Sequence, residues 1–133
     1  VAMSLSDLFC VERHKTNFLE LVRQKIDIVF ANEQEIMSLT ESKNIKDIIE
    51  FSKNTKRLVI ITRGNKGALA IYDNEVFECA AKKNLKISDL TGAGDLFAGG
   101  FLHGYINGKN IEESLNKGTE MSSKIIQIIG ARL

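Results

Sequence analysis

Apolar residues along this chain alternate between short continuous runs and longer stretches in which they recur every three or four positions. Short runs bounded by polar residues predict strands, and the longer spacing predicts helices. The predicted strands are residues 1–5, 27–31, 57–62, 68–72 and 75–79, with a further extended run at residues 85–88. The predicted helices are residues 11–24, a short one from residue 32, and residues 44–54, 92–108 and 111–130. Strands that alternate with helices and end in a hairpin at residues 73–74 indicate a layered α/β domain with a mostly parallel sheet and an antiparallel edge.

The two predicted C-terminal helices carry stripes of similar residues. Phe97, Phe101 and Tyr105 recur every four residues, which is typical of a buried helix face. Glycines recur at the same interval at positions 100, 104 and 108, and would let this helix lie close against a neighbour. The core positions predicted in the last helix are Ile111, Leu115, Ile125, Ile126 and Ile129.

Composition narrows the class of protein. The chain has 133 residues, of which 44% are hydrophobic and 26% charged, enough for a single globular domain over residues 1–133. The formal net charge is +1 and the lysines are not grouped with aromatic residues, so nucleic acid is not an expected partner. Cys10 and Cys79 lie far apart without a metal-binding spacing, which fits a reducing cytoplasm, and no apolar run has the length of a membrane helix. Whether the chain forms a homodimer stays open.

Residues 89–95, Asp-Leu-Thr-Gly-Ala-Gly-Asp, lie between the extended run and an apolar helix, so they predict a turn into a helix N-terminus. Gly92, Ala93 and Gly94 leave the backbone accessible, and a helix start offers unpaired N–H groups and the positive end of its dipole to an anion. Asp95 is a carboxylate beside this anion hole. Phosphoryl transfer requires at least a proton acceptor and, next to it, hydrogen-bond donors that stabilise the developing negative charge.

The same residues also have a structural interpretation. Acidic residues are favoured in the first turn of any helix, so Asp95 could act only as a dipole partner. Asp89 or Thr91 could act only as a cap.

Taken together, the stretch resembles the second signature of the ribokinase/PfkB family of carbohydrate and nucleoside kinases. That signature reads Asp-Thr-x-Gly-Ala-Gly-Asp before an apolar helix, and this chain differs only at Leu90, where threonine is usual. The resemblance implies a ribokinase-like α/β/α fold and transfer of phosphate from ATP, with Mg²⁺, to a primary hydroxyl of a sugar or nucleoside. It also implies that Asp95 accepts the proton, that the backbone of residues 92–94 stabilises charge, and that Asp89 orders the loop, sometimes with a monovalent cation such as K⁺.

The resemblance covers only the C-terminal half of the family's members. Val1 begins inside a predicted strand without an initiator methionine. We therefore expect a fragment that carries the ATP-binding and catalytic-base part of a kinase. If the chain is complete, the prediction of catalysis is weaker.

Two further motifs follow predicted strands, where ligands bind in such sheets. Asn32 and Glu35 come directly after the second strand and form either a capping box or, as the family's Asn-x-x-Glu motif implies, a pair that holds Mg²⁺ through water. Thr62, Gly64 and Gly67 follow the third strand and form either a tight turn or, as the resemblance implies, a loop that holds the nucleotide.

Other implied roles come from the resemblance alone. It adds Thr91 to the nucleotide site, and it places the adenine pocket near Gly118, Thr119 and Ser122. Residues 5–14 and 130–132 look like bacterial adenosine-kinase-like members, which is the only indication of substrate.

Two other functions remain open. One is a nucleotide-binding module without catalysis. The other is a Rossmann-type dinucleotide-binding unit, suggested by the glycines of residues 92–94, although the third glycine of that fingerprint would fall at Phe97.

Overall fold

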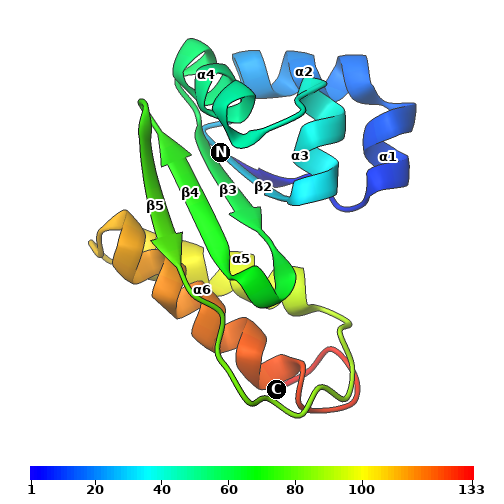
Figure 1. Cartoon of the computed structure of the whole chain (residues 1–133), viewed down its shortest axis with the longest axis vertical. Helices are drawn as coiled ribbons and strands as arrows, with labels where there is room; N and C mark the ends of the chain where they lie inside the picture. Colours follow the sequence, from blue (N-terminus) through cyan, green and yellow to red (C-terminus); the bar gives the residue numbers. More distant parts are fainter. The chain divides into compact units, whose positions relative to one another are not determined.

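A five-stranded sheet runs through the chain, and its strands lie side by side in sequence order (Figure 1). The strands are β1 (Ala2–Ser4), β2 (Ile28–Asn32), β3 (Leu58–Thr62), β4 (Ala68–Tyr72) and β5 (Glu75–Cys79). β1, β2 and β3 are parallel, whereas β4 and β5 form a hairpin. Its two turn residues, Asp73 and Asn74, have φ values of 45° and 73°, as the right-handed twist of a two-residue hairpin requires. The predicted mixed sheet is confirmed.

The computed structural model describes residues 1–133, which fall into two compact units. The first unit comprises Val1–Arg63 and Leu69–Val76. The second comprises Gly64–Ala68 and Phe77–Leu133.

Four helices belong to the first unit. At the N-terminus of three of them, a side chain accepts a hydrogen bond from a backbone N–H group of the first turn. The helices are α1 (Leu8–Arg13), α2 (Lys15–Gln24), α3 (Glu33–Thr40) and α4 (Ile45–Thr55). Asp7 caps α1, Asn32 caps α3 and Asn44 caps α4.

The core of the first unit is formed by side chains at alternate positions of its strands. Residues at every second position of β2, β3 and β4 point to one face of the sheet, where they meet apolar side chains of all four helices. The strand residues of this cluster are Val29, Ala31, Val59, Ile61, Leu69 and Ile71. The helix residues are Val11, Val22, Ile36, Leu39 and Ile48.

The continuous helix predicted over residues 11–24 was wrong. The chain leaves the helical conformation at His14, where φ is −121° and ψ is 26°, so that α1 and α2 are separate. No proline or glycine lies at this bend, and no other local feature of the sequence predicts it.

The second unit is built on two long helices whose backbones approach closely. These are α5 (Ala93–Ile106) and α6 (Ile111–Ile125). A Cβ added at Gly100 would lie 2.8 Å from the carbonyl oxygen of Lys117, and one added at Gly118 would lie 2.8 Å from the carbonyl oxygen of Phe97. The predicted close approach is confirmed at Gly100 and at Gly104, where a Cβ would lie 3.2 Å from Ser114 Oγ, whereas Gly108 lies beyond the end of α5 with open space around it.

The aromatic stripe of α5 is only partly buried. Phe97 and Phe101 are buried as predicted, but Tyr105 stacks on Phe101 with 5.7 Å between ring centroids and remains 40% exposed. Leu115 and Ile125 are core residues of α6 as predicted.

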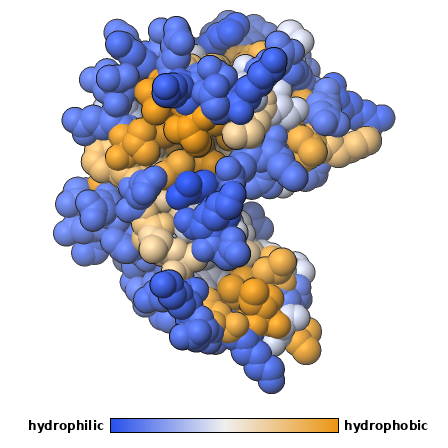
Figure 2. Space-filling view, in the orientation of Figure 1, coloured by the Kyte–Doolittle hydropathy of each residue, from blue (hydrophilic) through white to orange (hydrophobic).

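Two predictions about the second unit were wrong. Residues 85–88 form no strand, because the N–H of Ser88 donates to the carbonyl oxygen of Ile126 at 2.7 Å and not to a neighbouring strand. Helix α6 ends at Ile125 and not near residue 130, so Ile129 is 88% exposed and is no core residue. Figure 2 shows apolar surface on this unit, and its exposed large apolar side chains lie in the loop before α5, at the end of α5 and in the segment after α6. No helix in the chain is long and apolar enough to cross a membrane.

The contact between α5 and α6 predicts opposite effects of two neighbouring substitutions. Gly100→Ala places a methyl group against the backbone of α6, and we expect it to destabilise the protein by about 1–3 kcal/mol. Gly99→Ala is the matched control, because a Cβ there meets nothing within 4 Å. It should stabilise the protein by about 0.5–1 kcal/mol through helix propensity. Urea unfolding of both variants measures the difference, and equal effects would contradict the packing described here.

Candidate functional site

The carboxyl ends of β2 and β3 bring two of the predicted site residues into register. Asn32 is the last residue of β2 and Thr62 the last of β3, and they are paired in the parallel ladder. Parallel strands of an α/β sheet present their ligand sites at this edge. The first unit therefore brings Asn32, Glu35 and Thr62 together.

Asn32 and Glu35 form a reciprocal capping box at the start of α3. The Glu35 N–H donates to Asn32 Oδ1 at 2.9 Å, and the Asn32 N–H donates to Glu35 Oε2 at 2.9 Å. Asn32 Nδ2 also donates to Glu35 Oε1 at 2.9 Å. Both oxygens of a carboxylate that is only 6% exposed are therefore fixed in orientation, and each keeps a lone pair for a water molecule or a cation. The capping-box interpretation is confirmed.

The same four-residue pattern occurs a second time, at the start of α6. Asn110 and Glu113 form a capping box, with the Glu113 N–H donating at 2.8 Å and the Asn110 N–H donating at 3.1 Å. Glu113 is exposed, and its carboxylate receives no bond from the Asn110 side-chain amide. Asn-x-x-Glu by itself thus marks a helix start, and its position at a strand end distinguishes the first copy.

The glycines after β3 have different structural roles. Gly64 begins a single 3-10 turn, η1 (Gly64–Lys66), with φ +56° and open space where a Cβ would be. Gly67 has φ +90°, and a Cβ there would lie 2.0 Å from the carbonyl oxygen of Cys79. Gly67 is therefore required by the fold, as the tight-turn interpretation predicts.

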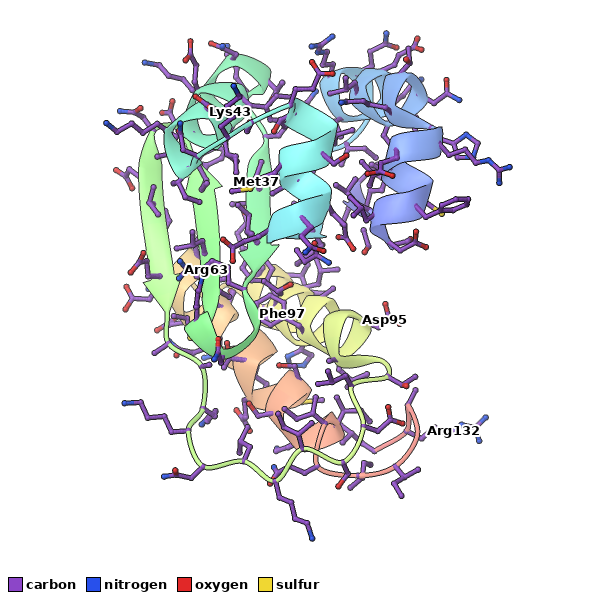
Figure 3. All side chains as sticks on the ribbon, turned by 45° about the vertical axis from the view of Figure 1, so that its right-hand side comes forward. Met37, Lys43, Arg63, Asp95, Phe97 and Arg132 are labelled. Carbon is purple, nitrogen blue, oxygen red and sulfur yellow. The ribbon has the colours of Figure 1, made fainter.

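The first turn of α5 differs from the starts of most other helices in this chain. Side chains of Asp or Asn cap α1, α3, α4 and α6, whereas α5 begins at Gly92 with φ 78° and no side-chain cap. The Ala93 N–H donates to the carbonyl oxygen of Leu90 at 3.2 Å, and the N–H groups of Gly94 and Asp95 have no partner. Asp95 is exposed, makes no hydrogen bond or ion pair, and projects from the helix start in Figure 3. A free carboxylate and free amide donors thus share one helix turn.

Asp89 is held by three hydrogen bonds. Its Oδ1 accepts the Thr91 hydroxyl at 2.6 Å and the Thr91 N–H at 2.8 Å, and its Oδ2 accepts the Gly130 N–H at 3.0 Å. These bonds, the Thr91 hydroxyl first, hold the pKa of the Asp89 carboxyl below its ordinary value. Asp89 is therefore bonded both within its own loop and to the segment after α6.

The three residues predicted for an adenine pocket lie on α6, and two of them already have packing roles. Gly118 lies against Phe97, and Thr119 is buried with its hydroxyl 3.4 Å from Cys79 Sγ. The hydroxyl of Ser122 is partly exposed and donates to the carbonyl oxygen of Thr119 at 3.3 Å. These contacts give a structural reason for a small residue at position 118.

The chain contains no group of three or more His, Cys, Asp or Glu side chains with the geometry of a metal site. Asn32 and Glu35 belong to the first unit, and Asp89 to the second. Mg²⁺ keeps several waters and binds substrate phosphates through few protein carboxylates, so the donor set of Asn32 and Glu35 is chemically suited to such an ion.

Sequence reasoning missed the contribution of the segment after α6. Gly130 donates to Asp89, and Ala131 lies beside Gly92, where a Cβ on Gly92 would be 3.1 Å from that of Ala131. Only the resemblance of residues 130–132 to adenosine-kinase-like proteins singled out this segment, and no local pattern indicated its contacts.

The family model that describes pfkB family carbohydrate kinases matches residues 6–133. The chain belongs to this family. The predicted relationship to the ribokinase/PfkB kinases is thereby confirmed, and the mixed sheet with its helices is a ribokinase-like α/β fold.

Several relatives of this PfkB-family chain are similar over most of its length. A cytidine kinase of Thermococcus kodakarensis is 37% identical over 116 residues, which cover 85% of this chain and 41% of the relative. The crystal structure of adenosine kinase from Sinorhizobium meliloti matches with a TM-score of 0.94 and 38% identity, over 99% of this chain and 41% of that one. A fructokinase of Vibrio cholerae, solved with fructose, ADP and a potassium ion, matches with a TM-score of 0.79 and 26% identity, over 88% of this chain and 39% of that one. The chain thus spans less than half the length of these relatives.

The Rossmann alternative loses its structural basis. That fingerprint requires a strand directly before the glycine-rich turn, and residues 85–88 form none. The loop before α5 in this PfkB-family chain is instead held by the C-terminal segment.

The bonds to Asp89 predict a pH-dependent difference in stability. Because the pKa of Asp89 is lower in the folded than in the unfolded chain, its contribution is present above the unfolded pKa and is lost as pH falls through the folded value. Wild type should therefore exceed Asp89→Asn in free energy of unfolding at pH 7, and the difference should shrink below about pH 4. Urea unfolding of both proteins from pH 7 to pH 3 measures this difference. All other carboxylates are the same in the two proteins, so their contribution cancels. A difference independent of pH would contradict the assignment.

Proposed function

We propose that the protein carrying this chain transfers the γ-phosphoryl group of ATP to a primary hydroxyl of a nucleoside or sugar. The observation that carries this proposal is the first turn of α5, where the Asp95 carboxylate is exposed and unpaired beside unpaired N–H groups. Elsewhere the chain satisfies most helix starts with Asp or Asn caps. An uncapped start leaves the dipole and donors available to an anion.

Asp95 acts as the general base. Its carboxylate accepts the proton of the substrate hydroxyl as that oxygen forms a bond to the γ-phosphorus and the bond from phosphorus to the ADP oxygen breaks. Protonated Asp95 then releases the proton to solvent. The absence of any competing hydrogen bond or ion pair to its carboxylate supports this role.

The backbone at the start of α5 stabilises the negative charge on the phosphoryl oxygens. The N–H groups of Gly94 and Asp95 are unpaired, as is that of Gly92, whereas the N–H of Ala93 must first leave the carbonyl oxygen of Leu90. Preorganised donors of this kind act on charge as it develops in the transition state. Gly92 and Gly94 also carry no side chain that would keep the phosphate away from the backbone.

The other predicted residues bind the nucleotide and its cation. Asn32 and Glu35 would hold Mg²⁺ through water, and the cation would neutralise phosphate charge. The fixed carboxylate oxygens of Glu35 support this role. The nucleotide-contacting residues in this proposal are Thr62, Gly64, Gly67, Thr91, Gly118, Thr119 and Ser122, with Asp89 ordering the loop.

Similarity to an adenosine kinase and a cytidine kinase supports a nucleoside as the first acceptor to test. The fructokinase solved with ADP and potassium supports testing K⁺ as an activator and a sugar as the alternative acceptor.

The decisive experiment uses one preparation of the protein that carries this chain. It measures ATP·Mg²⁺ binding by calorimetry and phosphate transfer to adenosine, cytidine, ribose and fructose. Transfer to any of these acceptors is the expected result and identifies the substrate class. ATP binding without transfer would favour a nucleotide-binding module without catalysis. NADH binding in place of ATP binding would contradict the proposal.

Asp95→Asn should keep nucleotide binding and lower turnover by roughly 10²-fold or more, because the amide cannot accept the proton. Glu112→Gln is the matched control, since Glu112 is an exposed acidic residue in the first turn of α6. Loss of the favourable interaction with the helix dipole should cost either variant about 0.3–1 kcal/mol in stability. A purely structural Asp95 would leave turnover the same in both variants.

The two capping boxes allow the proposed cation role of Glu35 to be separated from its structural role. Glutamine is accepted at this position of a capping box, so Glu35→Gln and Glu113→Gln should both keep the fold. Only Glu35→Gln should weaken Mg²⁺-dependent ATP binding, by about 10-fold, as is common when a residue supporting a metal through its outer shell is lost. Calorimetry across a Mg²⁺ series checks this. Equal affinities in both variants would leave Glu35 as a cap alone.

A further inference from the structure

The segment after α6 is attached to the loop that leads into α5. The N–H groups of Ser88 and Asp89 both donate to the carbonyl oxygen of Ile126, at 2.7 and 3.2 Å. Four residues later the Gly130 N–H donates to Asp89 Oδ2 at 3.0 Å. The loop has no neighbouring strand and belongs to no helix, so these bonds replace a sheet or helix partner.

The same segment reaches the residue at which α5 begins. Gly92 has φ 78°, and a Cβ there would lie 3.1 Å from Ala131 Cβ and 3.5 Å from Ala131 Cα. The contacts therefore run from Ser88 to Gly92 without a gap of more than two residues, and they end three residues before Asp95. Arg132 makes none of them, and its side chain extends away from the loop in Figure 3.

We propose that residues 126–131 are a positioning element for the catalytic turn, which hold the 88–92 loop so that Asp95 and the free amides of α5 keep their direction. This inference rests on the proposed role of Asp95. In this role Gly130 acts through Asp89 and Ala131 acts through Gly92.

Physical considerations favour this role over mere packing. Residues 126–133 contain no helix or strand, and their large side chains Ile129 and Leu133 are 88% and 63% exposed, so they contribute little to the core of the unit. Residues 126–128 also bond back to α6, and the hydrogen bonds that join the segment to the rest of the unit go to one short loop. Misplacement of a reacting group by about 1 Å can cost roughly 10²-fold in rate, so small losses of order in this loop become large losses in turnover.

The test uses two substitutions at Gly130, whose φ is +91°. Valine is strained at positive φ, so Gly130→Val should turn the N–H away from Asp89, whereas Gly130→Asn should be tolerated. In the protein that carries this chain, we expect Gly130→Val to lower kcat by roughly 10- to 100-fold with little change in KM for ATP. Gly130→Asn should retain most of the activity. Hydrogen exchange at the Ser88 and Asp89 amides should be faster in Gly130→Val alone.

Combination with Asp95→Asn shows whether the segment acts through that residue. If it does, Gly130→Val should lower turnover in wild type but add almost nothing to Asp95→Asn, because coupled sites are non-additive. Independent, multiplicative losses would overturn the proposal, as would equal losses in Gly130→Val and Gly130→Asn. If Gly130→Val does not fold, Ala131→Gly removes only the methyl group beside Gly92 and should lower kcat in the same direction; unchanged kcat in Ala131→Gly would then count against the proposal.

The two proposals fail in different ways. Unchanged turnover in Asp95→Asn alone would reject the catalytic role of Asp95. A large loss in Asp95→Asn together with normal turnover in Gly130→Val, despite faster exchange at Asp89, would reject only the positioning role of residues 126–131.

Discussion

The start of α5 is a helix N-terminus whose amides the chain does not satisfy. Unpaired N–H groups at a helix start carry the positive end of the helix dipole, and a chain normally satisfies them with Ser, Thr, Asn or Asp. This chain does so at α1, α3, α4 and α6 but begins α5 at a glycine with positive φ. The cost in helix stability is local, and it leaves donors and a free carboxylate in one turn. Hydrogen bonds from the segment after α6 hold the loop that leads into this turn.

Glycine serves three different physical purposes in the second unit. At position 92 it allows a left-handed residue at the helix start, and at position 67 it avoids a clash with the backbone at the end of β5. At positions 100 and 118 it lets two helix backbones approach. Only the first purpose concerns the proposed chemistry directly, so glycine content by itself does not mark the site.

The duplicated Asn-x-x-Glu pattern shows the same separation of structure and function. Both copies form capping boxes, because the side chains of Asn and Glu satisfy backbone donors wherever a helix starts. The copy at the end of β2 differs in burial, in the added bond from Asn32 Nδ2 to Glu35, and in its register with Thr62. Context, and not the pattern, makes the first copy a candidate for a cation site.

The sequence by itself determined the strands of the sheet, the hairpin at Asp73 and Asn74, the capping box at Asn32 and the family, because periodicity, turn chemistry and short motifs are local properties. It also placed the Asp95 carboxylate at a helix start. Only the tertiary structure decided that residues 85–88 are a loop, that α6 ends at Ile125, and that Gly130 and Ala131 hold the turn before Asp95. Those features depend on hydrogen bonds between residues about forty positions apart, such as Asp89 and Gly130, and an extended apolar run has the same local pattern whether its partner is a strand or the carbonyl oxygen of Ile126.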